Sequence, residues 1–456
     1  MRHQNKKGML YRKIQQKIER HLKSSDKILM IEGARQIGKS FIIRHVCSNM
    51  FKNYVEINLA DDKKGAGYFA SVKQNADFYL QLGAIAGNKL GQFDDTIVFL
   101  DEIQEYPHLI SMLKSLRADG RYHYITSGSL LGITLRQQTF IPMGSISIMD
   151  MYPLDFEEFL IANGVGADVI DYMREQYEKG EALTDNIHAM VLGLFKRYLL
   201  VGGLPDNVNV FIESQNITVI RRQQQEIRRL YSDDAAKYDE QHKLHLRRIY
   251  SLIPSAMENR KKRMVFKDIE NDKNKRYANY VDDFDYLIDS GIALEVKAIA
   301  NPKFPLVESM SKNLLKLYLN DVGLLTGILY NTNINAVLND NVGVNLGSVY
   351  ESVVAQELKA HGYALYYYDN KKNGEVDFLI DDYDSLSVVP MEIKSGKDYT
   401  IHSSLSHFIK TPDYGIRKAY VLSNKQQVFT KDSITYMPIY YVMFFGANDK
   451  EDVILK

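Results

Sequence analysis

Short apolar runs recur along the first third of the chain, and polar or glycine residues follow each of them. Runs of this length, with continuous or alternating apolar positions, are typical of strands. The intervals between most of them have helical periodicity, which begins with the amphipathic run at Phe41. Strands that alternate with helices predict an α/β domain over residues 1–154. The predicted strands are Ile28–Ile31, Tyr54–Leu59, Thr96–Leu100, Tyr122–Ser129 and Ser145–Met149.

The pattern changes three times after residue 154. Residues 155–240 have helical periodicity, which predicts a helical lid. Residues 241–310 contain three helical segments and then an apolar strand, the pattern of a winged helix. Residues 311–456 return to a mixture of helix and strand and predict a further α/β domain. The winged-helix segments are Leu246–Met257, Phe266–Ile269, Tyr277–Asp289 and the strand Ile292–Ala298.

Composition narrows the class of protein only slightly. The chain has 57 basic and 57 acidic residues, so its net charge argues neither for nor against a nucleic-acid partner. Its one cysteine, Cys47, excludes an internal disulfide and fits a reducing compartment. No apolar run approaches the roughly 20 residues of a membrane helix, and no apolar segment follows the basic start. We therefore expect a cytoplasmic protein without membrane association.

A glycine-rich segment between the first strand and the next helix carries the most specific pattern. Gly33 to Ser40 reads G-x-x-x-x-G-K-S, the phosphate-binding P-loop. Glycines let backbone N–H groups surround phosphate oxygens, and the helix start adds unpaired N–H groups. Lys39 is predicted to contact the β- and γ-phosphates, and Ser40 to ligate Mg²⁺. The predicted nucleotide-binding residues of this segment are Gly33, Arg35, Gln36, Ile37, Gly38, Lys39, Ser40 and Phe41.

Two carboxylates end the third strand. Asp101 and Glu102 follow the apolar run directly, which is the pattern of a Walker B strand. Asp101 is predicted to hold Mg²⁺, directly or through water, and Glu102 to polarise the attacking water. The two motifs together predict an ATP·Mg²⁺ site with Lys39 and Glu102 as catalytic groups. Nucleotide binding without turnover stays open as an alternative.

The fourth strand ends in small polar residues, Thr126-Ser127-Gly128-Ser129. In ATPases with an added strand between the P-loop and Walker B strands, this position carries sensor 1, a polar side chain near the γ-phosphate. Ser127 is the predicted sensor and a further nucleotide-binding residue. Thr126 and Ser129 are alternatives, as is a turn with no role in nucleotide binding.

These motifs, with the run Tyr152–Leu160, resemble the prokaryotic AAA-type ATPases that carry a C-terminal domain of unknown function. The resemblance implies a P-loop NTPase core of the AAA/ASCE type and covers nearly the whole chain. Its later motifs are Tyr198–Pro205, Lys316–Leu325, Gly347–Glu351 and Glu375–Phe378.

One arginine of that family has no counterpart in this sequence. Many relatives place a Gly-Arg pair after sensor 1, whereas Ser145 follows Gly144 here. The arginine that would contact the γ-phosphate is therefore unassigned. Arg35, Arg117 and an arginine from a neighbouring subunit are the alternatives, and the last requires self-association through the ATPase domain.

Four residues of the last domain follow the order of a PD-(D/E)XK nuclease core. Glu351 lies in a predicted helix, Asp377 in a strand, and Glu392 and Lys394 form E-x-K at the end of the next strand. The carboxylates can bind a second Mg²⁺ or Mn²⁺, chiefly through Asp377 and Glu392. Lys394 can orient or deprotonate water. Glu375 is expected to face the opposite side of its strand.

Basic residues cluster around the third helix of the predicted winged helix. Such a helix can enter a major groove while lysines bind phosphates, which makes DNA the candidate partner. A protein contact or a solvated basic loop is the alternative. The predicted nucleic-acid contacts are Arg260, Lys261, Lys262, Arg263, Lys273, Lys275 and Arg276.

The sequence thus predicts an ATPase that acts on DNA and carries a metal-dependent nuclease site with Glu351, Asp377, Glu392 and Lys394 as catalytic residues. The alternative is an ATP-gated binding or regulatory protein in which the nuclease-like domain is an inactive scaffold for partner contacts. Convergence of those four side chains in the fold would favour the first interpretation, and scattered side chains would favour the second.

Overall fold

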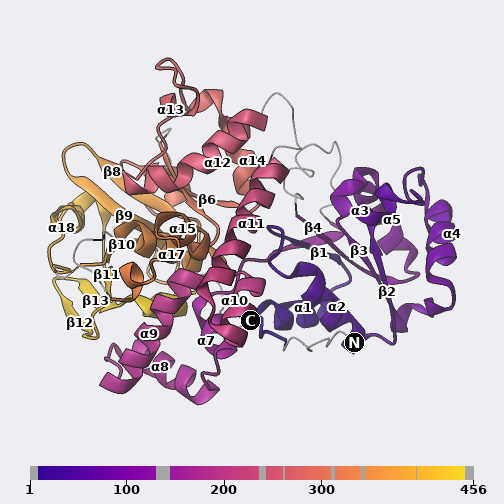
Figure 1. The fold of residues 1–456 in the computed structure, drawn as a ribbon, viewed down its shortest axis with the longest axis horizontal. Helices are drawn as coiled ribbons and strands as arrows, with labels where there is room; N and C mark the ends of the chain where they lie inside the picture. The colour runs from indigo at the N-terminus through magenta and orange to yellow at the C-terminus, as the bar shows by residue number, and fades with distance from the viewer. Residues whose placement is uncertain are drawn as a thin grey trace. The chain divides into compact units, whose positions relative to one another are not determined.

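In the computed structural model, the chain forms two compact units. We call Leu10–Tyr152 with Asp289–Ile292 the P-loop unit, and the described parts of Pro153–Ile288 and Ala293–Lys456 the C-terminal unit (Figure 1). No helix among the described residues is long and apolar enough to cross a bilayer. The described residues are 9–129, 144–235, 243–259, 262–309, 314–339, 344, 346–396 and 398–446.

The P-loop unit is built on one parallel sheet of five strands in the order β2-β3-β4-β1-β5. All five predicted strands are confirmed, and β4 lies between β1 and β3, as expected for the added strand. Because parallel strands end at the same edge, the residues that follow β1, β3 and β4 meet there. The strands are β1 (Ile28–Glu32), β2 (Asn53–Asn58), β3 (Thr96–Asp101), β4 (His123–Gly128) and β5 (Ile146–Asp150).

The central strands of this sheet are buried on both faces. Every residue of β3 is buried, so its apolar run is continuous rather than alternating. One apolar core joins Met30 of β1 and Leu100 of β3 to Phe78 and Leu113 of the covering helices. The helices of this unit are α1 (Ile14–Ser24), α2 (Lys39–Met50), α3 (Leu59–Lys64), α4 (Asn75–Ala86) and α5 (Pro107–Asp119).

The C-terminal unit contains a mixed sheet of eight strands in the order β12-β13-β11-β10-β9-β8-β6-β7. β6, which was predicted as the wing strand, pairs antiparallel with β7 and parallel with β8. The predicted boundary at residue 310 therefore falls inside this sheet. The strands are β6 (Ala293–Ile299), β7 (Leu315–Leu319), β8 (Tyr366–Asn370), β9 (Gly374–Asp382), β10 (Ser387–Lys394), β11 (Ala419–Ser423), β12 (Phe429–Lys431) and β13 (Ile434–Pro438).

Along the chain, the helices of this unit come before the first strand of the eight-stranded sheet and between its later strands (Figure 1). The third helix predicted for the winged helix is shorter than expected, because the Asn279 side chain accepts the Arg276 N–H at 2.8 Å and favours a separate turn before α14. The helices are α7 (Phe156–Ala162), α8 (Ala167–Lys179), α9 (Asp185–Val201), α10 (Pro205–Ser214), α11 (Ile217–Ala235), α12 (Lys243–Glu258), α13 (Lys267–Glu270), α14 (Val281–Asp289), α15 (Val322–Leu329), α16 (Asn335–Leu338), α17 (Gly347–Ala360) and α18 (Ser403–Ile409).

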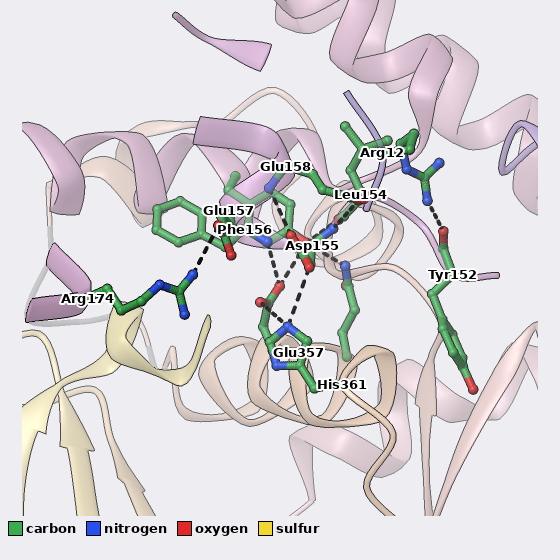
Figure 2. Close-up of polar contacts among 12 residues, drawn as sticks. Arg12, Tyr152, Leu154, Asp155, Phe156, Glu157, Glu158, Arg174, Glu357 and His361 are labelled. Atoms are coloured by element: carbon green, nitrogen blue, oxygen red, sulfur yellow. Dashed lines mark hydrogen bonds and ion pairs between the residues drawn. The ribbon is translucent and has the colours of Figure 1, made fainter. Parts of the chain in front are cut away.

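Buried polar contacts join the Tyr152–Leu160 motif to α17. Asp155 caps the start of α7, and His361 Nε2 lies 3.4 Å from its Oδ2 (Figure 2). Glu357 on α17 accepts the Phe156 N–H at 2.9 Å. Since buried polar groups are costly when they lack partners, these contacts fix α7 against α17. Asp155 of this motif thereby has a structural explanation.

A second polar joint connects the two glycine-containing motifs of the C-terminal unit. Asp321 caps α15 by accepting the Leu324 N–H at 3.2 Å, and it also accepts the Gly203 N–H at 2.6 Å. A Cβ atom on Gly202 would overlap the Asp321 carboxylate. Burial raises the pKa of Asp321 to about 6, and its N–H donors oppose that shift.

We predict that Asp321→Ala lowers the free energy of unfolding by about 2–4 kcal/mol, because it removes a helix cap and leaves the buried Gly203 N–H unpaired. Asn216→Ala is the matched control, since the exposed Asn216 side chain accepts the N–H groups of Thr218 and Val219. It should cost about 1 kcal/mol or less. Urea denaturation followed by circular dichroism measures both. Equal losses would contradict the role given to Asp321.

Candidate nucleotide site and carboxylate cluster

The segment between β1 and α2 has the backbone conformation that its glycines permit. Gly33 and Gly38 have φ values of 144° and 95°, in the region that disfavours other residues. A Cβ atom on Gly33 would also overlap the carbonyl oxygen of Met151. α2 begins directly after Gly38, so its first N–H groups face the loop.

The Lys39 ammonium is folded onto this loop. Its Nζ donates to the carbonyl oxygens of Gly33 at 2.8 Å and Ala34 at 2.9 Å. The residue is only 6% exposed, and burial lowers the pKa of Lys39 to about 8, although Glu102 and Asp101 oppose the shift. A buried cation with neutral partners gains more from an anion than from carbonyl groups.

Asp101 gathers two hydroxyl groups at the end of β3. Ser40 Oγ donates to its Oδ2 at 2.9 Å, and Ser127 Oγ donates to its Oδ1. Burial raises the pKa of Asp101, and both hydroxyl donors oppose that rise. A hydroxyl and a carboxylate oxygen side by side are the oxygen ligands that Mg²⁺ prefers, so these residues fit the predicted ion. Ser127 touches Asp101 itself, and its role as sensor 1 stays a prediction.

Glu102 is held in an unusual conformation beside Asp101. Its φ is 55°, in the left-handed region that costs a non-glycine residue about 1 kcal/mol or more. Its Oε2 accepts the Gln104 amide and the Ser129 hydroxyl, the latter at 3.2 Å. Arg35 Nε donates to Ser129 Oγ at 3.3 Å. Gln104 had no sequence signal, whereas Ser129 was a named alternative for sensor 1.

Two arginines differ from the sequence expectations. Arg12 is buried, and it donates to the Ile37 carbonyl of the P-loop at 2.9 Å and to the Tyr152 carbonyl at 2.6 Å (Figure 2). No motif indicated this brace. Arg117 binds the main chain and carboxylate of Asp26, which precedes β1. It therefore lies at the strand edge opposite the P-loop and is excluded as the arginine near the γ-phosphate.

A carboxyl pair lies directly before the P-loop. Glu32 at the end of β1 is in register with Asp150 at the end of β5. Burial, together with the Asp150 carboxyl and with Asp289, raises the pKa of Glu32 to about 8. This shift favours the neutral form of Glu32, which lessens the negative charge beside a loop suited to phosphate.

The structure gathers the four nuclease-type residues in one buried cluster. Glu351 comes from α17, Asp377 from β9, and Glu392 and Lys394 from β10. Lys394 Nζ donates to Glu392 Oε1 at 2.8 Å, and Asp377 Oδ2 accepts the Ile393 N–H at 2.8 Å. Burial, with the charges of Glu351 and Glu392, raises the pKa of Asp377 well above its usual range. The carboxylates are therefore close enough to repel one another.

Two lysines from other elements neutralise this cluster. Lys262 Nζ contacts Glu351 Oε1, and the fully buried Lys316 lies 3.7 Å from Glu351 Oε2 and 2.5 Å from Glu375 Oε1. Tyr318 donates its hydroxyl to Glu351 at 3.3 Å. The expectation that Glu375 faces away from the cluster is wrong, because residues two apart in a strand share a face. Lys316 and Tyr318 belong to the K-L-Y motif, which gives that motif a structural explanation.

The cluster does not fit a metal ion in this state. Among the residues that the structure describes, no group of three metal-ligating side chains is arranged to hold an ion. The carboxylates of Glu351 and Glu392 already have ammonium partners, at Lys262 and Lys394. A second Mg²⁺ or Mn²⁺ would have to displace Lys262 from Glu351.

Several of the predicted DNA contacts are engaged within the chain. Arg263 lies 3.1 Å from Asp369, and Lys275 lies 2.9 Å from Glu270. Lys262 binds Glu351, whereas Lys273 and Arg276 are exposed. The remaining two, Arg260 and Lys261, lie outside the described residues.

Comparison with protein families matches three segments of the chain. Residues 25–160 match the family model of an AAA domain. Residues 192–335 and 346–442 match two domains of unknown function, DUF8612 and DUF4143. No curated protein matches the sequence. With the strand order of the sheet, the first match identifies residues 25–160 as an AAA-type P-loop domain, the class that binds ATP.

Several solved structures resemble the chain at low identity. A Walker-type ATPase of Pyrococcus abyssi is 12% identical, with 71% of this chain and 97% of its own covered and a TM-score of 0.42. The RuvB Holliday junction branch migration motor of Thermotoga maritima is 12% identical, with coverages of 62% and 89% and a TM-score of 0.30. The Hsp104–ADP complex of S. cerevisiae is 14% identical, with coverages of 61% and 37% and a TM-score of 0.28. Similarity at this level adds nothing to the assignment from the AAA-domain match.

Proposed function

We propose that this chain binds ATP with Mg²⁺ and hydrolyses it at the edge of the five-stranded sheet. One observation carries the proposal: the Lys39 ammonium lies on the P-loop, while Ser40 Oγ and Asp101 Oδ2 lie 2.9 Å apart beside it. A cation for phosphates and an oxygen pair for a hard metal ion thus occur together. The AAA-domain match supports ATP as the nucleotide.

The residues of this site divide the work of hydrolysis. Lys39 would exchange its loop carbonyl partners for phosphate oxygens, which are charged and therefore stronger acceptors. Ser40 and Asp101 would hold the Mg²⁺, which when bound offsets the charge of the phosphates. Glu102 would orient the attacking water and accept its proton, since Gln104 and Ser129 hold its carboxylate in place.

Self-association through the P-loop unit belongs to the same proposal. A transition state that gathers charge on the γ-phosphate is usually stabilised by an arginine. Arg117 is engaged with Asp26 at the far edge of the sheet, and Ser145 replaces the arginine of the family's Gly-Arg pair. Arg35, which donates to Ser129 beside Glu102, and an arginine from a second copy are the two remaining candidates, and the second of them requires self-association.

Lys39→Ala is expected to weaken ATP binding in the presence of Mg²⁺ on the order of 10- to 100-fold, because it removes a charged contact to the phosphates. Isothermal titration calorimetry measures the affinity directly. Lys64→Ala is the control, since Lys64 is an exposed lysine at the end of α3. Unchanged affinity in Lys39→Ala would refute the nucleotide site.

Glu102→Gln is expected to retain ATP binding and to lower the rate of phosphate release about 10²- to 10⁴-fold, since a general base contributes that much. Glu105→Gln is the matched control, because Glu105 lies one turn away and pairs with the exposed Lys63 at 3.2 Å. Coupled phosphate-release kinetics compare the two variants. Wild-type protein that binds ATP but releases no phosphate would favour binding without turnover.

For the C-terminal unit we propose the scaffold interpretation. Glu351 is paired with Lys262 and lies near Lys316, and Glu392 is paired with Lys394. Paired buried charges are costly to separate, so this cluster serves packing better than rapid exchange of metal ions. The unit would then present surfaces to partners under control of the nucleotide state.

Metal-dependent cleavage of DNA is the second candidate function. The observation in its favour is the convergence of Glu351, Asp377, Glu392 and Lys394 in one buried cluster. In this interpretation Lys262 leaves Glu351 when metal and DNA bind, and the exposed Lys273 contributes to DNA contact. Lys394 would then orient the attacking water.

A cleavage assay separates these two functions. The scaffold interpretation predicts that wild-type protein with ATP and Mg²⁺ or Mn²⁺ releases phosphate but leaves linear, branched and single-stranded DNA intact. Cleavage that is lost in Glu392→Ala would instead establish the nuclease. Glu295→Ala is the matched control, because Glu295 forms the same E-x-K ion pair with Lys297, at 3.0 Å, on β6. Cleavage that Glu392→Ala retains would point to a contaminating enzyme.

A further inference from the structure

Two adjoining cavities in the C-terminal unit lie along α11. The first has a volume of about 340 Å³, and Arg221, Arg222 and Arg228 of α11 line it. The second has a volume of about 350 Å³ and shares Gln225, Arg228 and Ile328 with the first. Among the residues that the structure describes, no aspartate or glutamate lines either cavity. Each volume is within the range of cavities that hold small ligands.

Arg221 is a buried cation that has no carboxylate partner within the described part of the chain. The residue is 6% exposed, and its guanidinium donates to the carbonyls of Asn331 at 2.6 Å and Leu200 at 2.9 Å and to the Gln224 side chain at 2.7 Å. Its Nη2 has no acceptor among the described residues. Burial lowers the pKa of Arg221 to about 10, and no neighbouring carboxylate opposes the shift. Carbonyl dipoles balance part of this charge, but an anion would balance it more fully.

Two further arginines line the same cavity without ion pairs. Among the described residues, no carboxylate lies within ion-pair distance of Arg222 or Arg228, whereas Arg229 lies 3.9 Å from Asp233. Positions 221, 225 and 228 fall on one helical face, because residues three or four apart are neighbours. The described lining of the cavity therefore concentrates positive charge and includes no acidic residue to offset it.

The second cavity adds a polar group of a different kind. Tyr250 on α12 lines it and is 4% exposed, and its hydroxyl has no hydrogen-bond partner among the described residues. A buried hydroxyl without a partner is costly, so a ligand that accepts from it would be stabilised. Pro254, Leu319 and Ile328 give this cavity an apolar part, and Arg229, Ser232 and Ser251 also line it.

We propose that the two cavities bind a phosphate-bearing ligand of the nucleotide type, with its phosphate beside Arg221, Arg222 and Arg228 and its uncharged part beside Tyr250. Guanidinium groups match phosphate oxygens in geometry and charge. A free mononucleotide and a segment of single-stranded nucleic acid present this same chemistry. The site shares no residue with the P-loop and does not depend on ATP hydrolysis.

Binding is tested with Lys39→Ala protein, so that the P-loop contributes little. The probes are AMP, inorganic pyrophosphate and a short single-stranded oligodeoxynucleotide, titrated calorimetrically, with hydrogen exchange used to locate protection. We expect protection of α11 and about a tenfold loss of affinity in Arg222→Gln and in Arg228→Gln. Arg197→Gln is the control, because Arg197 is exposed on α9 and its one hydrogen bond within the described residues is to the Gly193 carbonyl.

The probes identify the source of the phosphate. AMP binding that Tyr250→Phe weakens, with pyrophosphate binding unchanged, would support a small nucleotide. Oligonucleotide binding whose affinity falls steeply with salt would support single-stranded nucleic acid. The proposal is overturned if no probe binds, if Arg222→Gln and Arg228→Gln bind as well as the control, or if protection is confined to residues 33–40.

Discussion

The buried carboxylate of Asp101 makes the contacts on which the proposed nucleotide site depends. It accepts the Ser40 hydroxyl from the start of α2 and the Ser127 hydroxyl from the end of β4. Three elements that are distant in sequence are thereby tied at one edge of the sheet, because β4 lies between β1 and β3. Lys39 completes the site through the loop carbonyls, and Arg12 braces the same loop from outside. The strand order brings these residues to one edge of the sheet, and the Asp101 carboxylate holds the two hydroxyl groups in place there.

Buried carboxylates have different partners in the two units. Asp101 is held by hydroxyl groups, which leave its charge available to a cation. Glu351 is held by ammonium groups, which neutralise it. A motif of acidic residues therefore predicts a metal site only where no cation of the chain already occupies the position. The arginines of α11 present the opposite case, a cationic cavity whose counter-charge the described chain does not supply.

The sequence predicted correctly those features that a short continuous segment determines. The five strands, the P-loop and the Walker B carboxylates are each set by a short continuous segment, and their positions agree with the structure. The sequence did not predict side-chain contacts between residues that are far apart in the chain. Lys262 was assigned to DNA contact but pairs with Glu351, which lies 89 positions away. Arg12 and Gln104 carry no motif, and β6 reads as a wing strand until its pairing with β8 is known. The prediction that Glu375 faces away from Asp377 was wrong for a reason that the sequence already contains. The two residues are two positions apart in one strand and therefore lie on the same face.

Calorimetric titration of the purified wild-type chain with ATP, with and without Mg²⁺, tests the central claim most directly. Because the Ser40 hydroxyl and the Asp101 carboxylate lie together beside the Lys39 ammonium, we predict saturable binding that Mg²⁺ strengthens. No detectable binding of ATP, or an affinity that is the same in the presence and absence of Mg²⁺, would contradict the account.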